Sequence, residues 1–226
     1  MKKICLIILT SIFAFTSAFA QKDKEATAIL NKLSQQYRTY DAVKTDFSLL
    51  IDNEQAKIKQ TQTGTLLAKS KTNKYKVTIY ENGSAAKSNV TQEIISDGKS
   101  QWTYLKDANE VQLADADNSE EGFNPAKIFT MYEKGYKYLY TGQQKIGAKI
   151  YQVIDLTPEQ AGKTFFKVRL MVDKVKNQLY SAMIFDKNGS HYTYTLRSFA
   201  SVKSVSDASF AYNKKDHPGA ELVDLR

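Results

Sequence analysis

Cysteine is nearly absent from this chain of 226 residues, which contains only Cys5. Cys5 lies in an apolar stretch near the N-terminus that we expect to be removed, so the mature protein would have no thiol. Disulfide bonds and thiolate metal sites are then excluded, and hydrophobic burial must hold the fold together. Histidine is also scarce, and a histidine-based metal site would require His191 and His217 to meet. We therefore expect no metal and no cofactor.

The usual motifs of enzymes and nucleotide-binding proteins are missing as well. The chain has no Gly-x-Ser-x-Gly elbow, no Walker loop and no Gly-x-Gly-x-x-Gly fingerprint. It has no nucleic-acid-binding motif either, so no nucleic-acid partner is expected. An enzyme that acts on lipids or glycans through carboxylates such as Asp97 and Asp155 remains an alternative, but the Asp97-Gly98 pair is better explained as a turn. These absences favour a protein that is not an enzyme.

Proline is rare, and no linker-like stretch interrupts the chain. Only three prolines occur, and we find no low-complexity tract and no repeat of fixed period. One hydrophobic core can serve a chain of this size. We predict a single domain over residues 21–226, present as a monomer.

The N-terminus has the pattern of a secretory signal peptide. Met1-Lys2-Lys3 is followed by a mostly apolar run over residues 4–15 and then by small residues up to Ala20. This run of 12 residues is shorter than the roughly 20 that a membrane-spanning helix needs, and no second run follows. We predict a signal peptide over residues 1–20 and a mature protein in the periplasm.

Positive charge predominates, with a formal net charge of +8 that falls to +6 once Lys2 and Lys3 are removed. The lysines are scattered along the predicted strands and loops rather than gathered in one block. This distribution is typical of a solvated basic surface. Attraction to an anionic membrane surface or to an acidic partner is the alternative.

Residues 23–40 have the period of an amphipathic helix, because apolar residues recur at spacings of three and four. This stripe must lie against another apolar surface. Its members are Ala26, Ile29, Leu30, Leu33, Tyr37 and Tyr40. A second, shorter helix is predicted from Asn124-Pro125 to Tyr132, with Ile128, Phe129 and Tyr132 as its apolar face.

From Val43 onward the hydrophobic period changes to two, which indicates half-buried strands. In the segment 74–80, for example, Tyr75, Val77 and Ile79 alternate with polar side chains. Tight turns such as Asp97-Gly98 favour an antiparallel meander. The predicted strands cover residues 43–51, 58–69, 74–80, 91–97, 100–106, 109–114, 136–141, 148–157, 164–173, 178–187 and 191–200, with a short one near 209–212.

About eleven strands with one apolar face are too many for two helices to cover if the sheet is flat. A sheet this wide must curl to keep its apolar face out of water. We therefore predict a mainly β fold of the α+β class with two or more helices. It is a curved, antiparallel, unclosed β-barrel with a helical lid over an apolar cavity.

Five segments form a pattern that is more specific in its order than any one of them alone. The most distinctive is Ser96-Asp97-Gly98-Lys99 followed by Trp102 and Tyr104, a hairpin signature. The others are Val43–Phe47, Gln62–Leu66, Asn124–Ile128 and Ser206–Tyr212. In this order the chain resembles the periplasmic outer-membrane lipoprotein carrier family (LolA-like), over nearly the whole predicted mature protein.

The resemblance implies an unclosed barrel with a helical lid and a chaperone function. The cargo would be lipidated proteins, accepted by their acyl chains from an inner-membrane ABC lipoprotein transporter (LolCDE-like). Delivery would be to the outer membrane, to a LolB-like or unknown acceptor. Family members often carry an arginine shortly after the second strand, which helps to hold the lid closed. Here Lys69-Ser70-Lys71 occupies that region, and Lys71 could replace the arginine only in part because it lacks the planar fork.

Candidate site residues are apolar, because an acyl chain is held by non-directional contacts. We predict that Ile29, Leu33, Phe129 and Tyr132 form the underside of the lid. We predict that the lid closes over Phe47, Leu49, Leu66, Val77, Trp102 and Val168.

A lipid-binding envelope-stress sensor or regulator on the same scaffold is the alternative function, since a fold does not determine what its cavity is used for. Such a protein would usually need a second domain, for which this chain has little room.

Overall fold

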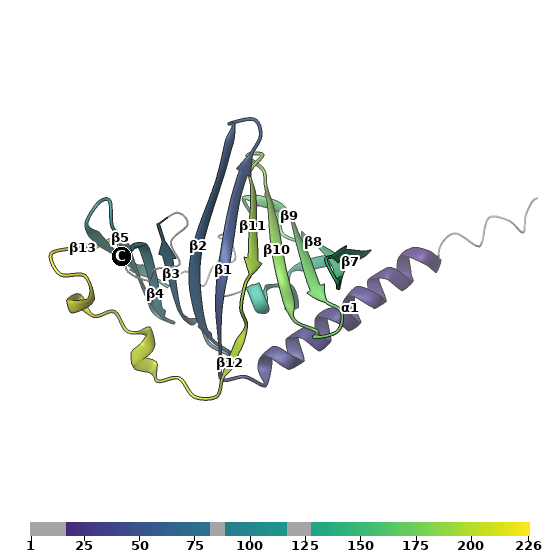
Figure 1. Ribbon diagram of the computed structural model, residues 1–226, viewed down its shortest axis with the longest axis horizontal. Helices are drawn as coiled ribbons and strands as arrows, with labels where there is room; N and C mark the ends of the chain where they lie inside the picture. The colour runs from purple at the N-terminus through teal and green to yellow at the C-terminus, as the bar shows by residue number, and fades with distance from the viewer. Residues whose placement is uncertain (1–16, 82–88, 117–127) are drawn as a thin grey trace, which may run out of the picture.

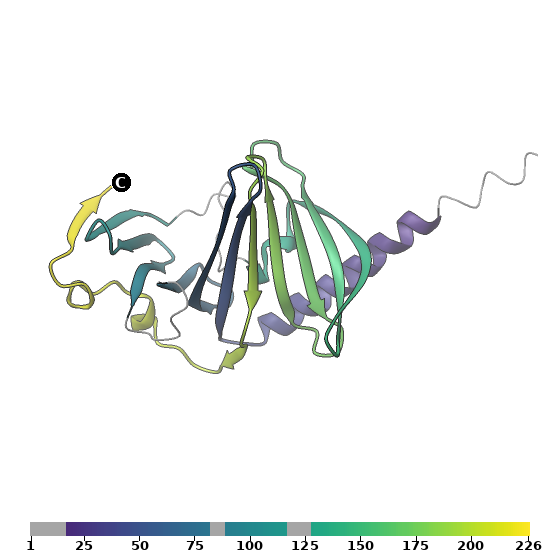
Figure 2. The ribbon, with the colours of Figure 1, turned by 45° about the horizontal axis from the view of Figure 1, so that its top comes forward.

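The computed structural model describes residues 17–81, 89–116 and 128–226, with side chains described from residue 24 onward. One long α-helix lies along one side of a broad, strongly curved β-sheet (Figures 1 and 2). Most of the predicted signal peptide, residues 1–16, lies outside the described part of the chain.

The helix α1 spans Ser17–Arg38, so it begins earlier than predicted, within the C-terminal end of the predicted signal peptide. Its predicted apolar stripe is confirmed over five residues, since Ala26, Ile29, Leu30, Leu33 and Tyr37 are all buried. Asn31, Lys32 and Gln35 between them face solvent, as an amphipathic helix on a sheet requires, whereas Ser34 is buried. We define the inner face of the sheet as the face on which this stripe lies.

Thirteen strands form one sheet, whereas the sequence predicts eleven strands and one further short strand. Their bounds are β1 Ala42–Asn53, β2 Ile58–Lys69, β3 Lys74–Tyr80, β4 Val90–Asp97, β5 Ser100–Leu105, β6 Glu110–Asp115, β7 Tyr136–Ile146, β8 Lys149–Pro158, β9 Phe165–Asp173, β10 Leu179–Asp186, β11 His191–Leu196, β12 Ala200–Val202 and β13 Glu221–Asp224. The order across the sheet is β13-β6-β5-β4-β3-β2-β1-β11-β10-β9-β8-β7, and β12 pairs with β1 beside this path.

The sheet is unclosed and largely antiparallel, which confirms the predicted architecture in its main features. Strands β13 and β7 are its two ends in the pairing order. The prediction of a purely antiparallel sheet is wrong at one end, where β13 runs parallel to β6. The predicted strand at 209–212 is wrong as well. A short 3-10 helix, η3 (Asp207–Phe210), forms there because the Ser206 side chain accepts a hydrogen bond from the Ala208 amide and caps a turn.

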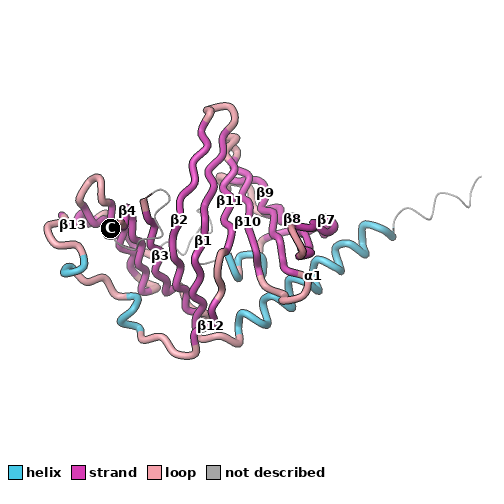
Figure 3. Tube along the Cα trace, in the orientation of Figure 1, coloured by secondary structure: helices cyan, strands magenta, loops and turns pink. Residues whose placement is uncertain are grey.

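The prediction of two or more helices is also wrong, because α1 is the only α-helix in the parts of the chain that the structure describes. The short cyan turns in Figure 3 are 3-10 helices. The start of the expected second helix, residues 124–127, falls outside those parts. Its remainder is 3-10 rather than α-helical, in residues 128–129 and in the turn η2, Met131–Glu133. Thr130, with φ of −137°, leaves the helical region and interrupts the backbone just before that turn.

Gly64, in the segment Gln62–Leu66 of the family resemblance, lies where the inner face has no room for a side chain. Gly64 of β2 pairs with Phe47 of β1. A Cβ atom at Gly64 would come within 2.6 Å of Phe47 Cζ and 2.5 Å of the Thr78 carbonyl oxygen. The missing side chain therefore lets the Phe47 ring lie across β2 toward β3.

Candidate functional site

The inner face carries one continuous apolar cluster that joins the helix to the sheet. It contains the α1 stripe, the segment Ile128–Tyr132, and alternate residues of β1, β2, β3, β7, β8, β9 and β10. Strands place these side chains on one face because successive residues point to opposite sides. We call the sheet part of this cluster the groove, and α1 together with residues 128–133 the lid.

Nine of the ten predicted site residues lie in this cluster. Phe47, Leu49, Leu66, Val77 and Val168 belong to the groove, and each is at least nine-tenths buried. From the lid come Ile29, Leu33, Phe129 and Tyr132. The structure therefore brings the predicted lid underside and the predicted floor together.

Trp102 is the exception, because it lies on the outer face of the sheet. Trp102 pairs with Ile95 on β4, whereas the groove residue Val77 pairs with Ile94. Neighbouring residues on a strand point to opposite faces, so Trp102 and Val77 are on different sides. Its ring stacks on Tyr212, with 6.0 Å between the ring centroids.

A second, smaller apolar surface on the outer face explains this position. The C-terminal segment after β12 crosses the side of β3–β6 away from α1 and ends in β13 (Figures 1 and 2). Phe210 from this segment is fully buried, and His217 stacks on Tyr104 with a centroid distance of 3.8 Å. Trp102 is therefore partly covered by the chain's own C-terminal part and lies on the face opposite the groove.

Aromatic rings pack the lid onto the inner face. Tyr37 of α1 stacks on Phe129, with ring centroids 4.9 Å apart. Phe199, which precedes β12, packs edge-on against Phe129 and Tyr40, with ring centroids 6.1 and 5.9 Å apart, respectively. Such contacts hold the helix by shape and burial rather than by directed bonds. Tyr37 and Phe199 were not predicted as site residues, although Tyr37 belongs to the predicted stripe.

The predicted apolar cavity is not an empty space in this closed arrangement. Under α1, the hollow between Leu33, Tyr37, Phe129 and Leu179 holds about 10 Å³, room for no more than one water molecule. Protein interiors pack to high density, so an amphipathic helix settles into a hollow that its stripe can fill. The lid thus occupies the space in which an acyl chain is predicted to lie.

A polar cluster fastens the lid at the C-terminal end of α1. Glu133 of η2 accepts a hydrogen bond from the Ser34 hydroxyl and pairs with Arg38, with Nη2 2.5 Å from Oε2. The hydrogen bond and the charge of Glu133 both raise the pKa of the Arg38 guanidinium. We call Ser34, Arg38 and Glu133 the latch. Sequence reasoning missed it because Arg38 and Glu133 are 95 residues apart in the chain.

One buried polar group of the lid is unsatisfied. The hydroxyl of Tyr132 has no hydrogen-bond partner among the described residues, and burial raises its pKa. An unsatisfied buried hydroxyl costs about 1–3 kcal/mol. The closed arrangement therefore contains a penalty that is relieved when residues 128–133 move toward water.

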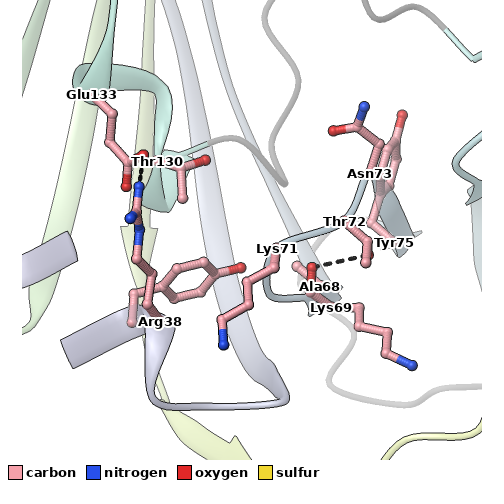
Figure 4. A pocket seen from close by; sticks show the side chains of 10 residues that line it. Arg38, Ala68, Lys69, Lys71, Thr72, Asn73, Tyr75, Thr130 and Glu133 are labelled. Atoms are coloured by element: carbon pink, nitrogen blue, oxygen red, sulfur yellow. Dashed lines mark hydrogen bonds and ion pairs between the residues drawn. The ribbon is translucent and has the colours of Figure 1, made fainter. Parts of the chain in front are cut away.

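A cleft of about 500 Å³ opens beneath the C-terminal end of α1. Three parts of the chain border it: the end of α1, the turn between β2 and β3, and residues 130–133 (Figure 4). Its lining residues are Tyr37, Arg38, Ala68, Lys69, Lys71, Thr72, Asn73, Tyr75, Thr130 and Glu133. The cleft meets the apolar cluster through Tyr37, Ala68 and Tyr75, which belong to both.

The carboxylates of the enzymatic alternative have structural partners on separate strands. Asp97 Oδ1 accepts hydrogen bonds of 2.8 Å from the amides of Lys99 and Ser100, which fixes the turn between β4 and β5. Asp155 on β8 accepts two hydrogen bonds from Arg169, of 2.7 and 2.8 Å.

Within the described ranges, no group of three His, Cys, Asp or Glu side chains is placed to hold a metal ion. No described helix has the length and apolar character needed to cross a membrane.

A family model described as outer membrane lipoprotein carrier protein LolA matches residues 38–213. No curated protein sequence matches the chain. An uncharacterized conserved protein from Thermus thermophilus has a similar structure, with a TM-score of 0.54 and 12% identity over 88% of this chain and 99% of that one.

Two further solved structures match less closely. A LolA superfamily protein from Nitrosomonas europaea has a TM-score of 0.45 and 15% identity, over 83% of this chain and 97% of that one. In the Pseudomonas aeruginosa MucA/MucB complex the corresponding values are 0.47 and 14%, over 84% and 62%.

Proposed function

This chain belongs to the LolA family of outer membrane lipoprotein carriers, and from that premise we propose that it carries lipidated proteins across the periplasm with their acyl chains in the groove. The lid has to leave the groove before a chain can enter. The observation that carries the proposal is the single apolar cluster shared by an amphipathic helix and one face of an unclosed sheet.

The energetics of exchange suit a carrier. An acyl chain gains about 0.8 kcal/mol for each buried CH₂, which alone would make release from the groove very slow. Opening of the lid opposes this gain. Each large apolar side chain of the lid that leaves the groove becomes exposed to water, at a cost of about 1.5–3 kcal/mol. Five apolar side chains of α1 are buried in the closed arrangement. The net binding free energy is the gain from burying the acyl chain minus the cost of opening the lid. This difference leaves an affinity low enough for delivery.

The chemistry of the groove also supports the proposal. Its members are aliphatic and aromatic, and non-directional contacts of this kind accept acyl chains of different length and position. We propose that cargo comes from a LolCDE-like inner-membrane ABC transporter and passes to a LolB-like or other acceptor in the outer membrane. The working form is a periplasmic monomer from which residues 1–20 have been removed.

Mass spectrometry of material that co-purifies with the protein from the periplasm tests this function. We expect a triacylated polypeptide, bound in a ratio of one to one. A free phospholipid without any acylated polypeptide, or no ligand at all, would contradict the carrier function and favour the lipid-binding regulator instead. Leu170→Glu, which places a carboxylate in the groove, should co-purify without the acylated polypeptide, because Leu170 is fully buried in the apolar cluster. Circular dichroism of the variant shows whether the sheet is intact.

Loosening the latch is expected to speed the uptake of acyl chains. In Glu133→Gln the hydrogen bond from the buried Ser34 hydroxyl loses its charged acceptor, which weakens the closed state by about 1 kcal/mol. The open population then rises about fivefold. Stopped-flow uptake of a fluorescent fatty acid measures the rate, and hydrogen exchange of the α1 amides measures opening.

Asp224→Asn is the control for the latch variant, because Asp224, the last residue of β13, pairs with Arg226 and is remote from the lid. If Glu133→Gln and Asp224→Asn took up the probe equally fast, the latch would have no part in lid control.

A further inference from the structure

The cleft beneath the C-terminal end of α1 differs in charge from the groove that it adjoins. Three of its lining residues, Arg38, Lys69 and Lys71, are cationic, and one, Glu133, is anionic. In Figure 4 Arg38 and Glu133 stand on one side of the cleft and Lys71 on the other. The cleft therefore has a positive rim.

The partners of these charges leave a cationic excess. Glu133 is already engaged by Ser34 and Arg38. Lys69 and Lys74 share one carboxylate, that of Asp207, at 2.8 and 2.7 Å. The nearby Asp41 carboxylate accepts a hydrogen bond of 2.9 Å from the Val205 amide and lies outside the cleft lining.

Lys71 has no ion pair among the described residues, and its side chain is exposed at the cleft. Its φ of 63° is unusual for a residue with a long side chain. The turn around it is held in place, because the Ser70 amide donates to the Asp41 carbonyl at 2.8 Å and the Lys74 amide donates to Thr72 Oγ1 at 3.2 Å. The ammonium group is thus presented from a fixed turn.

The floor of the cleft is apolar and continuous with the groove. Tyr37, Ala68 and Tyr75 are buried, and all three belong to the apolar cluster. A positive rim over an apolar floor matches a molecule with an anionic head and an apolar chain. Lysine suits a phosphate or carboxylate head as a point charge, without a demand on its orientation.

We propose that this cleft binds the anionic headgroup of an amphiphile whose chain lies in the groove, with Lys71 as the principal cation. The inference rests on the proposed function, since it requires an acyl chain in the groove. An anion in the cleft also competes with Glu133 for Arg38, so that headgroup binding favours opening of the lid.

A matched pair of amphiphiles tests the proposal by calorimetric titration of the full chain. Dodecyl phosphate and dodecyl phosphocholine share the chain and the phosphate, but only the first carries a net negative charge. We expect dodecyl phosphate to bind about fivefold more tightly, and Lys71→Gln to remove most of this preference. Lys57→Gln is the control, because Lys57 is an exposed turn lysine with a similar φ of 54° in the hairpin between β1 and β2.

The outcomes separate the inference from the proposed function. Equal binding of both amphiphiles, or a preference that survives in Lys71→Gln, would overturn the headgroup site and leave the carrier function standing. Failure of both amphiphiles to bind would contradict the carrier function itself. Inorganic phosphate alone is the third arm, and binding as tight as that of dodecyl phosphate would show a free-phosphate site and overturn the role of the chain.

Discussion

Tethering α1 to the turn between β9 and β10 is expected to abolish the uptake of acyl chains. Gln36 of α1 and Gln178 of that turn line the same small hollow under the helix. Nearby, Asn177 Nδ2 donates a hydrogen bond of 3.2 Å to Gln36 Oε1, so the two elements are in direct contact. A cross-link between cysteines at 36 and 178 would hold the lid over the groove.

The experiment benefits from the scarcity of cysteine, because Cys5 is the only native thiol and Cys5→Ser removes it. Gln36→Cys with Gln178→Cys, joined by a reagent that a reductant can cleave, should reduce uptake of a fluorescent fatty acid at least about tenfold. Cleavage of the tether should restore it. Each single-cysteine variant, treated with the same reagent, is the control. Undiminished uptake by the tethered protein would show that the groove fills without movement of α1.

Ile29→Glu is expected to reduce the affinity for an acyl chain at least about tenfold. Ile29 is 7% exposed in the apolar cluster. A carboxylate at this position cannot lie against a hydrocarbon surface without a cost of several kcal/mol. The lid could then cover neither the empty groove nor a bound chain. Titration with a fluorescent acylated peptide measures the loss.

Asn31→Glu places the same carboxylate on the exposed side of α1 and should leave affinity unchanged. Trp102 offers a separate control for folding, since this single tryptophan lies on the outer face and reports on the sheet rather than on the lid. Its emission should be the same in both variants. Binding by Ile29→Glu equal to that of Asn31→Glu would remove α1 from the acyl site.

The latch differs from the lid control that the family resemblance implies. There, an arginine after the second strand reaches toward the lid. In this chain Lys71 stands near that position without an ion pair to a described residue, and the arginine belongs to the lid itself, as Arg38. Its partner Glu133 lies on the other half of the lid. In the proposed opening, α1 moves away from residues 128–133, so the latch breaks together with the contacts between the lid and the groove.

Local sequence determined the elements that depend on local patterns. The spacing of Ala26, Ile29, Leu33 and Tyr37 places one apolar stripe on α1, because a helix returns to the same side every three or four residues. Alternation along β3 and β9 likewise assigns Val77 and Val168 to one buried face. So many strands with one apolar face predict an unclosed, curved sheet. The order of the short motifs identifies the family.

Tertiary structure alone decided which apolar residues of the strands face the groove and which lie on the outer face of the sheet. Trp102 alternates with Gln101 and Thr103 as a groove residue would, yet it faces outward because the C-terminal segment supplies a second apolar cover. The pairing of β13 with β6 and the latch between Arg38 and Glu133 join residues that are remote in the chain. Whether the hollow stands open or filled depends on how α1 docks, which local periodicity does not specify. These features arise from long-range packing, where many registers satisfy the same local pattern and burial selects one.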